Sequence, residues 1–353
     1  MITIKDVARA AGVSVATVSR VYTGSDRVRE ETRVHVWEVA GRLGYAPHGT
    51  ARSLITSRTS TIGVLLPDLY GEFFSEVIRG IDQTAQREGY HLLVSSAHAE
   101  QSAVEAALRS MRGRVDGLII MSPGHEALAP LANLPANFPV VLLNSAGGTD
   151  QTDSITVANA DGARTMVRHL ISLGHRRIAI LRGSPGNFDA AERLRGYREA
   201  LTEAGISPRP RWELEGNFSE ASGYAAAEAI LAQTDRPTAL FAANDSMAIG
   251  ALAGFRRAGL TVPGDMAVAG FDDIPLSRYM DPPLTSVHVD ISALGERATA
   301  RLLAGMDRDP ARERIREVLP VTLVVRRSCG GVPMPDATGR SAAGSHFNER
   351  EAS

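Results

Sequence analysis

Two short apolar stripes at helical spacing occupy the first 22 residues of the chain. The positions are Ile4, Val7, Ala8 and Ala11, then, after a break at Gly12, Val15, Val18 and Val21. Apolar residues three and four apart share one face of a helix, so this pattern predicts two short helices joined near Gly12. Two such helices form a helix-turn-helix, although an ordinary helical hairpin in a core shows the same spacing.

The ends of these helices carry matching signals. Thr3 and Asp6 have the spacing of a capping box, Ser14 can cap the second helix, and Gly24 can end it. A third helix is predicted for residues 30–43, ended by a Gly at position 44. Its expected apolar face consists of Val34, Trp37, Ala40 and Leu43. Residues 1–46 are therefore predicted to be a small helical head.

The segment that follows the head differs from it. Residues 47–54 begin with Pro and include Gly49, and they are too few for a stable isolated helix. We expect this segment to be unfolded until a partner orders it. Residues 47–58 are accordingly predicted to be a hinge helix and linker.

From Thr61 onward, short apolar runs alternate with longer helical stretches. The predicted strands are residues 62–66, 90–94, 117–121, 140–143, 177–181, 239–242, 267–271 and 318–325. The predicted helices are residues 72–88, 100–112, 161–173, 190–204, 219–233, 246–258 and 294–303. Alternation of this kind is typical of an α/β body with doubly wound parallel sheets.

The length of this body suffices for two lobes. We predict a two-lobed body over residues 59–328, with ligand bound at the strand carboxyl ends between the lobes. The first lobe comprises about 59–158 plus 288–318, and the second comprises about 159–287 plus 319–328. Residues 329–353, rich in Gly, Ser, Ala and Pro, are expected to be a disordered tail.

Charge is divided unequally between the head and the rest. Residues 1–58 contain nine Lys or Arg and five acids, a balance of +4, whereas the remainder carries 29 basic and 35 acidic residues, a balance of −6. A basic head on an acidic body suits contact with phosphates, although solvated surface charge is the alternative. No apolar run is long enough to cross a membrane. The chain begins directly with a helix pattern and has a single cysteine, so we expect a cytoplasmic protein.

Catalytic constellations are not found in the sequence. Lys5 is the single lysine, so the body cannot form a phosphate loop with a lysine, and no nucleophile elbow is present. Asp272 and Asp273 form the best acidic pair, yet they lack a nucleophile or metal partner. We therefore predict no catalytic residues, no metal and no cofactor, and we favour binding without turnover.

Several motifs carry a further signal. They are residues 3–8 (Thr-Ile-Lys-Asp-Val-Ala), 13–21, 43–47, 51–54, 244–248, and 270–275 leading to 283–287. With them the chain resembles bacterial transcription regulators of the lactose-repressor (LacI) family from about Thr3 to Ser328. The resemblance implies a homodimer on near-palindromic operator DNA and a body like that of periplasmic sugar-binding proteins. It also implies that a small effector switches operator affinity.

For the head, the resemblance assigns base reading to Val15 and Ala16, with Arg20 as a third base-contacting position. Small apolar side chains pack on thymine methyl groups but form no bidentate hydrogen bonds, so Arg20 should carry more of the guanine readout. Thr17 and Ser19 suit phosphate contacts.

In the family, the hinge folds on DNA and inserts a Leu into the minor groove. The matching position is Leu54, and Arg52 is the accompanying DNA-binding residue. An apolar wedge of this kind kinks the duplex. The alternative for Leu54 is a linker residue docked on the body. Gly49 departs from the Ala or Val that is commoner there, which weakens hinge ordering.

In the body, the resemblance points to an effector cleft. The matching positions are Phe73, Phe74, Asn144, Arg193, Phe218, Asn244 and Asp272. Polar groups here would clamp ligand hydroxyls, although Arg193 and Asp272 alternatively form a structural ion pair and at least one of the phenylalanines lies in the core. Ser145 replaces the Trp of purine-responsive members, and Asn187 and Asp189 also differ from that branch. A sugar or sugar derivative is therefore the expected effector.

Two other functions compete with this prediction. One is a cytoplasmic sugar-binding protein, and the other is a sugar-modifying enzyme, each with an accessory helical head. The missing signal peptide and the head count against the first. The missing nucleophile, metal and phosphate constellations count against the second.

Overall fold

The computed structural model describes residues 2–22, 27–45, 58–97, 101–121, 126–135, 137–145, 152–306 and 314–331. Several predicted features lie outside the described residues. They are the helix stop at Gly24, the hinge with Gly49, Arg52 and Leu54, and the tail beyond residue 331.

The head consists of α1 (Ile4–Ala10), α2 (Val15–Tyr22) and α3 (Glu30–Leu43). Its own buried cluster comprises Val7, Ala8, Ala11, Val18, Val21, Val28, Val36, Val39 and Ala40. The Asp6 carboxylate accepts hydrogen bonds from the Thr3 backbone and hydroxyl, and Ser14 Oγ accepts one from Thr17 N at 3.0 Å. Gly44 ends α3 in the left-handed conformation with φ 63°. The two predicted N-terminal caps and this glycine stop are thus confirmed.

The predicted apolar face of α3 is wrong in part. Val34 and Trp37 are 48% and 51% exposed, whereas Val36 and Val39 are buried with Ala40. Both sets have helical spacing, so periodicity alone could not predict which of them is buried. The contacts of α3 with α1 and α2 determine the buried set. Val15 likewise leaves its expected stripe, since it is 41% exposed while Val18 and Val21 are buried.

The first lobe is built on a six-stranded sheet in the order β11-β5-β4-β3-β1-β2. Its strands are β1 (Thr61–Leu66), β2 (His91–Ser96), β3 (Gly117–Met121), β4 (Val140–Leu143), β5 (Asp153–Val157) and β11 (Arg316–Leu319). The sheet packs with α5 (Glu72–Arg87), α6 (Gln101–Met111) and α11 (Ile291–Met306), beside the 3-10 segment η1 (Glu126–Asn133). Strands such as β1 and β3 are buried on both faces, as parallel strands covered by helices require.

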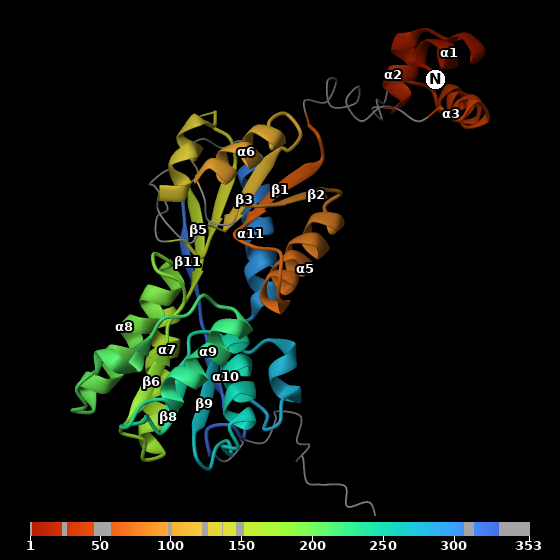
Figure 1. Ribbon diagram of the computed structural model, residues 1–353. Coiled ribbons are helices and arrows are strands. Elements are labelled where there is room, and N and C mark those ends of the chain that lie inside the picture. Colours follow the sequence, from red (N-terminus) through yellow and green to blue (C-terminus); the bar gives the residue numbers. More distant parts are fainter. Residues whose placement is uncertain are drawn as a thin grey trace, which may run out of the picture.

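The second lobe has a six-stranded sheet in the order β12-β10-β9-β8-β6-β7. Its strands are β6 (Ile178–Leu181), β7 (Glu213–Leu214), β8 (Ala239–Ala242), β9 (Ala267–Asp272), β10 (Thr285–His288) and β12 (Thr322–Val324). Its helices are α7 (Asn159–Ser172), α8 (Phe188–Glu203), α9 (Glu220–Leu231) and α10 (Asp245–Arg257), with η2 (Pro210–Trp212) and η3 (Pro275–Tyr279). The chain passes between the sheets after β5, after β10 and after β11 (Figure 1).

The α/β body with parallel sheets is confirmed, with corrections in detail. Strands β5, β7 and β10 were not predicted, because short runs such as Asp153–Val157 contain polar residues. The single strand predicted for residues 318–325 is two strands in different sheets, and β12 pairs antiparallel with β10. Residue Cys329 was predicted to belong to the disordered tail but packs on the second lobe, since it is 1% exposed and its Sγ lies 3.1 Å from Thr285 Oγ1. None of the described helices is long and apolar enough to cross a membrane.

Candidate functional site

The carboxyl ends of the strands carry backbone in the left-handed region. Asn144 directly follows β4 with φ 44°, Asp272 ends β9 with φ 102°, and Asp273 follows with φ 52°. Phe218, in the loop after β7, has φ 67°. Non-glycine residues adopt such angles at a cost in free energy, and they gather where the surrounding structure fixes side chains for function. Asn144 comes from the first lobe and the others from the second.

Arg193 of α8 is the centre of a buried polar group at these ends. We call this group the interlobe cluster; it comprises Asn144, Asn159, Asp189, Arg193 and Asp272. The Arg193 side chain is 3% exposed, and its Nη2 lies 3.0 Å from Asp272 Oδ1. Its Nε donates to Asn159 Oδ1 at 2.8 Å, and its Nη1 donates to the Ala243 carbonyl. The guanidinium also lies over the Phe271 ring, 3.7 Å from the centroid.

Two carboxylates face this one guanidinium. Asp189, in the first turn of α8, accepts a hydrogen bond from Asn159 Nδ2 at 2.8 Å. Burial raises the pKa of Asp189 to about 6, against the attraction of Arg193. Burial likewise raises the pKa of Asp272 to about 6, although Arg193 again lowers it. The interlobe cluster therefore contains one more acid than base.

Asn144 is the member of the interlobe cluster that comes from the first lobe. It is 3% exposed, and neither its amide nitrogen nor its amide oxygen has a hydrogen-bond partner among the described residues. The amide nevertheless lies close enough to lower the pKa of the Asp189 carboxyl. A buried amide without partners loses the hydrogen bonds it would make in water. Such a group is suited to a ligand that supplies the missing partners.

Asp245, the first residue of α10, holds the loop that follows β9. Its fully buried carboxylate accepts hydrogen bonds from Ile274 N at 2.9 Å, Ser277 Oγ at 2.5 Å and Ser286 Oγ at 2.6 Å. Burial raises the pKa of Asp245 to about 8, and the nearby Asp272 carboxylate adds to that rise. Asp245 is thus a positioning residue for the strand end that presents Asp272.

The predicted acidic pair separates into two roles. Asp272 faces Arg193, whereas Asp273 lies 2.6 Å from Arg326 Nη1 and 3.1 Å from His288 Nδ1. Although burial raises the pKa of Asp273, hydrogen bonds from His288 and Arg326 lower it below its usual value. Asp273 is therefore engaged within the second lobe, and only Asp272 joins the interlobe cluster.

Asn244 and Phe218 lie together at the start of α10. Asn244 Oδ1 caps the helix by accepting from Met247 N at 3.0 Å, and Asn244 Nδ2 donates to the Phe218 carbonyl at 3.0 Å. The Phe218 ring covers Gly183, where an added Cβ would lie 2.0 Å from Phe218 Cζ. Both the oxygen and the nitrogen of the Asn244 amide are therefore engaged by the protein. This structural role of Asn244 was not predicted from the sequence.

Phe73 and Phe74 begin α5 in the first lobe. Their rings meet edge to face at 5.5 Å and 87°, and both are partly buried against the main core. Glu72 beside them reaches the second lobe, where its Oε2 accepts a hydrogen bond from Leu276 N at 3.0 Å. The start of α5 therefore contacts both the core and the opposite lobe.

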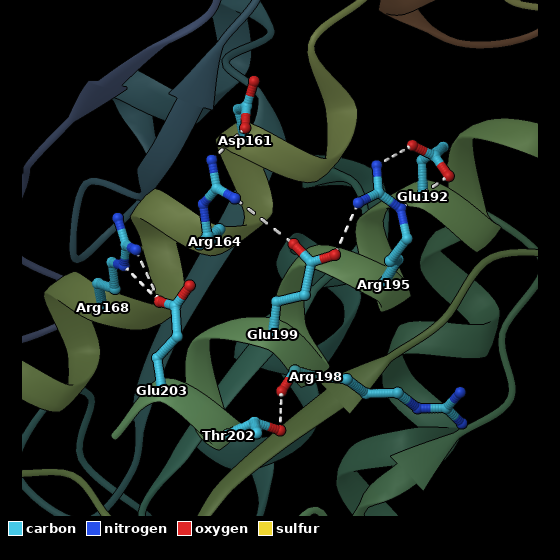
Figure 2. Close-up of polar contacts among 9 residues, drawn as sticks. All are labelled: Asp161, Arg164, Arg168, Glu192, Arg195, Arg198, Glu199, Thr202 and Glu203. Atoms are coloured by element: carbon cyan, nitrogen blue, oxygen red, sulfur yellow. Dashed lines mark hydrogen bonds and ion pairs between the residues drawn. The ribbon is translucent and has the colours of Figure 1, made fainter. Parts of the chain in front are cut away.

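The outer face of α8 carries a different set of charges (Figure 2). Arg164 of α7 pairs with Asp161 and lies 3.5 Å from Glu199, which in turn lies 2.6 Å from Arg195. Arg195 also pairs with Glu192, and Arg168 pairs with Glu203. A surface hollow runs along this face between Ala191 and Glu203. Its charges are exposed and mutually paired, so this hollow does not call for a charged ligand.

The first turns of α2 form the outward surface of the head. Val15, Ala16 and Arg20 are exposed there, and Thr17 and Ser19 are partly buried. Thr17 Oγ1 lies 2.8 Å from Ser14 Oγ, so this hydroxyl also supports the N-terminal cap. The helix therefore presents its predicted base-reading side chains away from the core of the head.

Asn159 and Asp245 were missed by the sequence analysis, and Asp189 was noted only as a departure from another branch. Asn159 begins α7, two residues after the end of the unpredicted strand β5, so the missing strand concealed it. Asp245 stands next to Asn244 in the predicted motif, and Asp189 lies one helical turn before Arg193. Their closeness in sequence to predicted site residues was the signal that could have identified Asp245 and Asp189.

This architecture defines a class of protein: a helix-turn-helix head joined to a two-lobed body of the periplasmic-binding type. Residues 3–48 match the model of bacterial regulatory proteins of the lacI family, and residues 167–329 match the periplasmic binding protein-like domain. The HTH-type transcriptional repressor PurR of Aliivibrio fischeri (strain MJ11) is 37% identical over 332 residues, covering 93% of this chain and 98% of that protein.

Solved structures agree with these matches. The lac repressor dimer bound to operator and the anti-inducer ONPF superposes with a TM-score of 0.83 at 34% identity, covering 93% of this chain and 99% of that chain. The complex of the transcriptional regulator CelR with cellobiose gives a TM-score of 0.71 at 31% identity, covering 93% of this chain and 100% of that chain. The protein belongs to the lacI family of bacterial regulatory proteins.

Proposed function

We propose that this protein is a cytoplasmic, homodimeric transcriptional repressor whose affinity for a near-palindromic operator is switched by a sugar-like effector. The effector would bind between a first lobe of about 59–158 plus 288–318 and a second of about 159–287 plus 319–328. The observation that carries the proposal is Asn144, a buried amide without hydrogen-bond partners among the described residues, beside Asp189 of the opposite lobe. A ligand that completes these hydrogen bonds favours one arrangement of the lobes over another.

The effector would contact the polar ends of the strands and the aromatic rings beside them. Asn144 and Asp272 supply hydrogen-bonding groups, whereas Arg193 and Asn244 act mainly by holding their neighbours. Phe73, Phe74 and Phe218 are the candidate rings for stacking on a sugar. Two observations favour a sugar over a purine: Ser145 is small, and the CelR structure contains cellobiose.

The head would bind the operator through the start of α2. Val15, Ala16 and Arg20 are the proposed base contacts, because they are exposed on the first turns of the second helix. Thr17 and Ser19 are the proposed phosphate contacts, and Arg52 and Leu54 remain proposed hinge contacts.

Dimerisation is supported by apolar side chains on the surface of the body. Leu69 and Tyr70 of the first lobe are 47% and 74% exposed, and Leu276 and Tyr279 of the second are 43% and 76% exposed. A homodimer in which each lobe contacts its copy would cover such groups. Two heads would then face two half-sites of the operator.

We propose binding without turnover at the interlobe site. Arg193 pairs with Asp272, Asp189 accepts a hydrogen bond from Asn159, and the described residues of the cluster include no serine, cysteine or lysine placed as a nucleophile beside a base. Two of the relatives named above, PurR and the lac repressor, are transcriptional repressors by name.

Operator binding is tested by fluorescence anisotropy of the purified full chain on palindromic and scrambled duplexes across a salt series. We expect a preference for the palindrome and an affinity that falls steeply with salt, because phosphate contacts release counterions. Arg20→Ala should reduce the preference by roughly 10-fold to 100-fold, the cost of one bidentate base contact.

The matched control is Arg42→Ala, an exposed arginine in the last turn of α3. It should keep the preference for the palindrome. Equal affinity of the wild type for palindromic and scrambled duplexes at every salt concentration would refute operator recognition. Equal loss of preference in both variants would remove Arg20 from base reading.

A further inference from the structure

We propose that Asp189 is a specificity-determining residue that makes the interlobe site select an uncharged or cationic sugar rich in hydrogen-bond donors and reject phosphorylated and carboxylate-bearing sugars. This inference rests on the proposed effector site. It concerns which chemical class of sugar the site accepts.

The guanidinium of Arg193 is already occupied by the protein. Its three nitrogens are directed to Asn159, the Ala243 carbonyl and Asp272, and its face lies over Phe271. The positive charge of Arg193 is therefore already offset by Asp272, which weakens its attraction for an anionic ligand. It acts instead as a positioning residue for the two carboxylates around it.

The groups that remain for a ligand are mainly acceptors. A carboxylate has two oxygens and about four acceptor positions, and Asp189 spends one of its oxygens on Asn159 Nδ2. Asp272 directs Oδ1 toward Arg193. Hydroxyl and ammonium groups would satisfy the remaining positions, whereas a phosphate or carboxylate would bring further acceptors to them.

The start of α8 is also made less favourable for an anion by the protein itself. Free backbone N–H groups at a helix N-terminus ordinarily attract phosphate. Here Asn187 Oδ1 accepts from Ala190 N at 2.9 Å, and the Asp189 carboxylate supplies negative charge within the same first turn. A ligand anion would therefore add a third negative charge to those of Asp189 and Asp272, with one guanidinium to offset them.

The experiment uses the purified full chain in a thermal-shift and calorimetric panel of matched sugars. Glucose, galactose, mannose and ribose are each tested as the parent sugar, the amino sugar, the sugar acid and the sugar phosphate. We expect binding to be confined to parent or amino sugars. The acid and phosphate of any sugar that binds should be at least about 10-fold weaker. A phosphate or acid that binds the wild type as tightly as its parent sugar would overturn the proposal.

Asp189→Asn tests the residue itself, because the amide keeps the shape and removes the charge. Its preference for the parent over the anionic sugar should fall by about 10-fold. The control is Glu199→Gln, on the outer face of the same helix, which should keep the wild-type preference. Equal selectivity in Asp189→Asn and wild type would overturn the role of Asp189.

A measurement without ligand separates this inference from the proposed function. The pKa of Asp189 is raised by burial above its value in the unfolded chain, so its charge destabilises the fold at pH values above about 6 and not below about 4. Asp189→Asn should thus raise the melting temperature by about 2–6 °C at pH 8 and change it little at pH 4. The charged groups that face Asp189 are Arg193 and Glu192 on its own helix and Asp272 on β9.

If no sugar of the panel binds, the proposal of a sugar effector is refuted. The melting temperatures still test whether Asp189 adds an excess negative charge to the interlobe cluster. An unchanged or lower melting temperature of Asp189→Asn at pH 8 would overturn that excess. The same pH dependence in Glu199→Gln would also overturn it, since the effect would then belong to the whole helix.

Discussion

The inner and outer faces of α8 carry acids and arginines in different surroundings. On the inner face the Arg193 side chain is 3% exposed and pairs with Asp272, which is 6% exposed. On the outer face Arg195 is 53% exposed and pairs with Glu199, which is 34% exposed (Figure 2). Both pairs look alike as contacts, with separations of 3.0 Å and 2.6 Å.

Exposure to solvent makes the ion pairs of the two faces contribute differently to the free energy of unfolding. Buried ions lose their hydration, so every unmatched group costs free energy and removing one partner leaves a charge uncompensated. Exposed ions keep much of their hydration and are screened by salt, so their pairs contribute little. The inner face is therefore where a ligand can change the balance, and the outer face is a solvated surface.

The largest expected effect is that of Arg193→Ala. It leaves the buried Asp272 and the partly buried Asp189 without their cation and should lower the free energy of unfolding by about 3–5 kcal/mol at pH 7.5. Urea denaturation of the full chain measures this change. Arg195→Ala, the matched change on the outer face, should cost less than about 1 kcal/mol. Similar losses in both variants would erase the distinction between the faces.

An intermediate effect is expected from the two amides of the interlobe cluster. Asn159 bridges Arg193 and Asp189, so Asn159→Ala should cost about 1–3 kcal/mol of unfolding free energy. Asn144 has no hydrogen-bond partner among the described residues, and glycine adopts its left-handed backbone readily. Asn144→Gly should therefore lower the free energy of unfolding by no more than about 1 kcal/mol.

The same two variants differ in their response to ligand. Asn144→Gly should lose the effector's influence on operator binding, which anisotropy titration with effector measures, while its stability stays within about 1 kcal/mol of the wild type. A stability loss in Asn144→Gly as large as in Asn159→Ala would show that the Asn144 amide already has a structural partner.

The smallest effect is expected on the outer face. A double-mutant cycle with Arg195→Ala and Glu199→Ala should give a coupling free energy of about 0.2–1 kcal/mol. This coupling should diminish between low salt and about 0.5 M salt, because screening acts on exposed charges. A coupling that is large and independent of salt would place this pair with the buried ones.

Much of the fold was readable from the sequence because its signals are local. Helix caps at Thr3 and Ser14, the glycine stop at Gly44, and the alternation of apolar runs with helical stretches all depend on neighbouring residues. The buried face of α3 could not be predicted, because two sets of its apolar residues have helical spacing and either could face α1 and α2. The split between β11 and β12 could not be predicted either, because one continuous apolar run contains strands of two different sheets.

The candidate site divides in the same way. The sequence by itself determined that Asn144, Arg193 and Asp272 stand near strand or helix ends, together with the family to which their motifs belong. Only the tertiary structure decided that Arg193 is engaged by Asn159, the Ala243 carbonyl and Asp272, that Asp189 joins this group as a second acid, and that Asn144 lacks a hydrogen-bond partner among the described residues. The physical reason is that burial, pairing and net charge at a site depend on residues far apart in the chain, which only folding brings into contact.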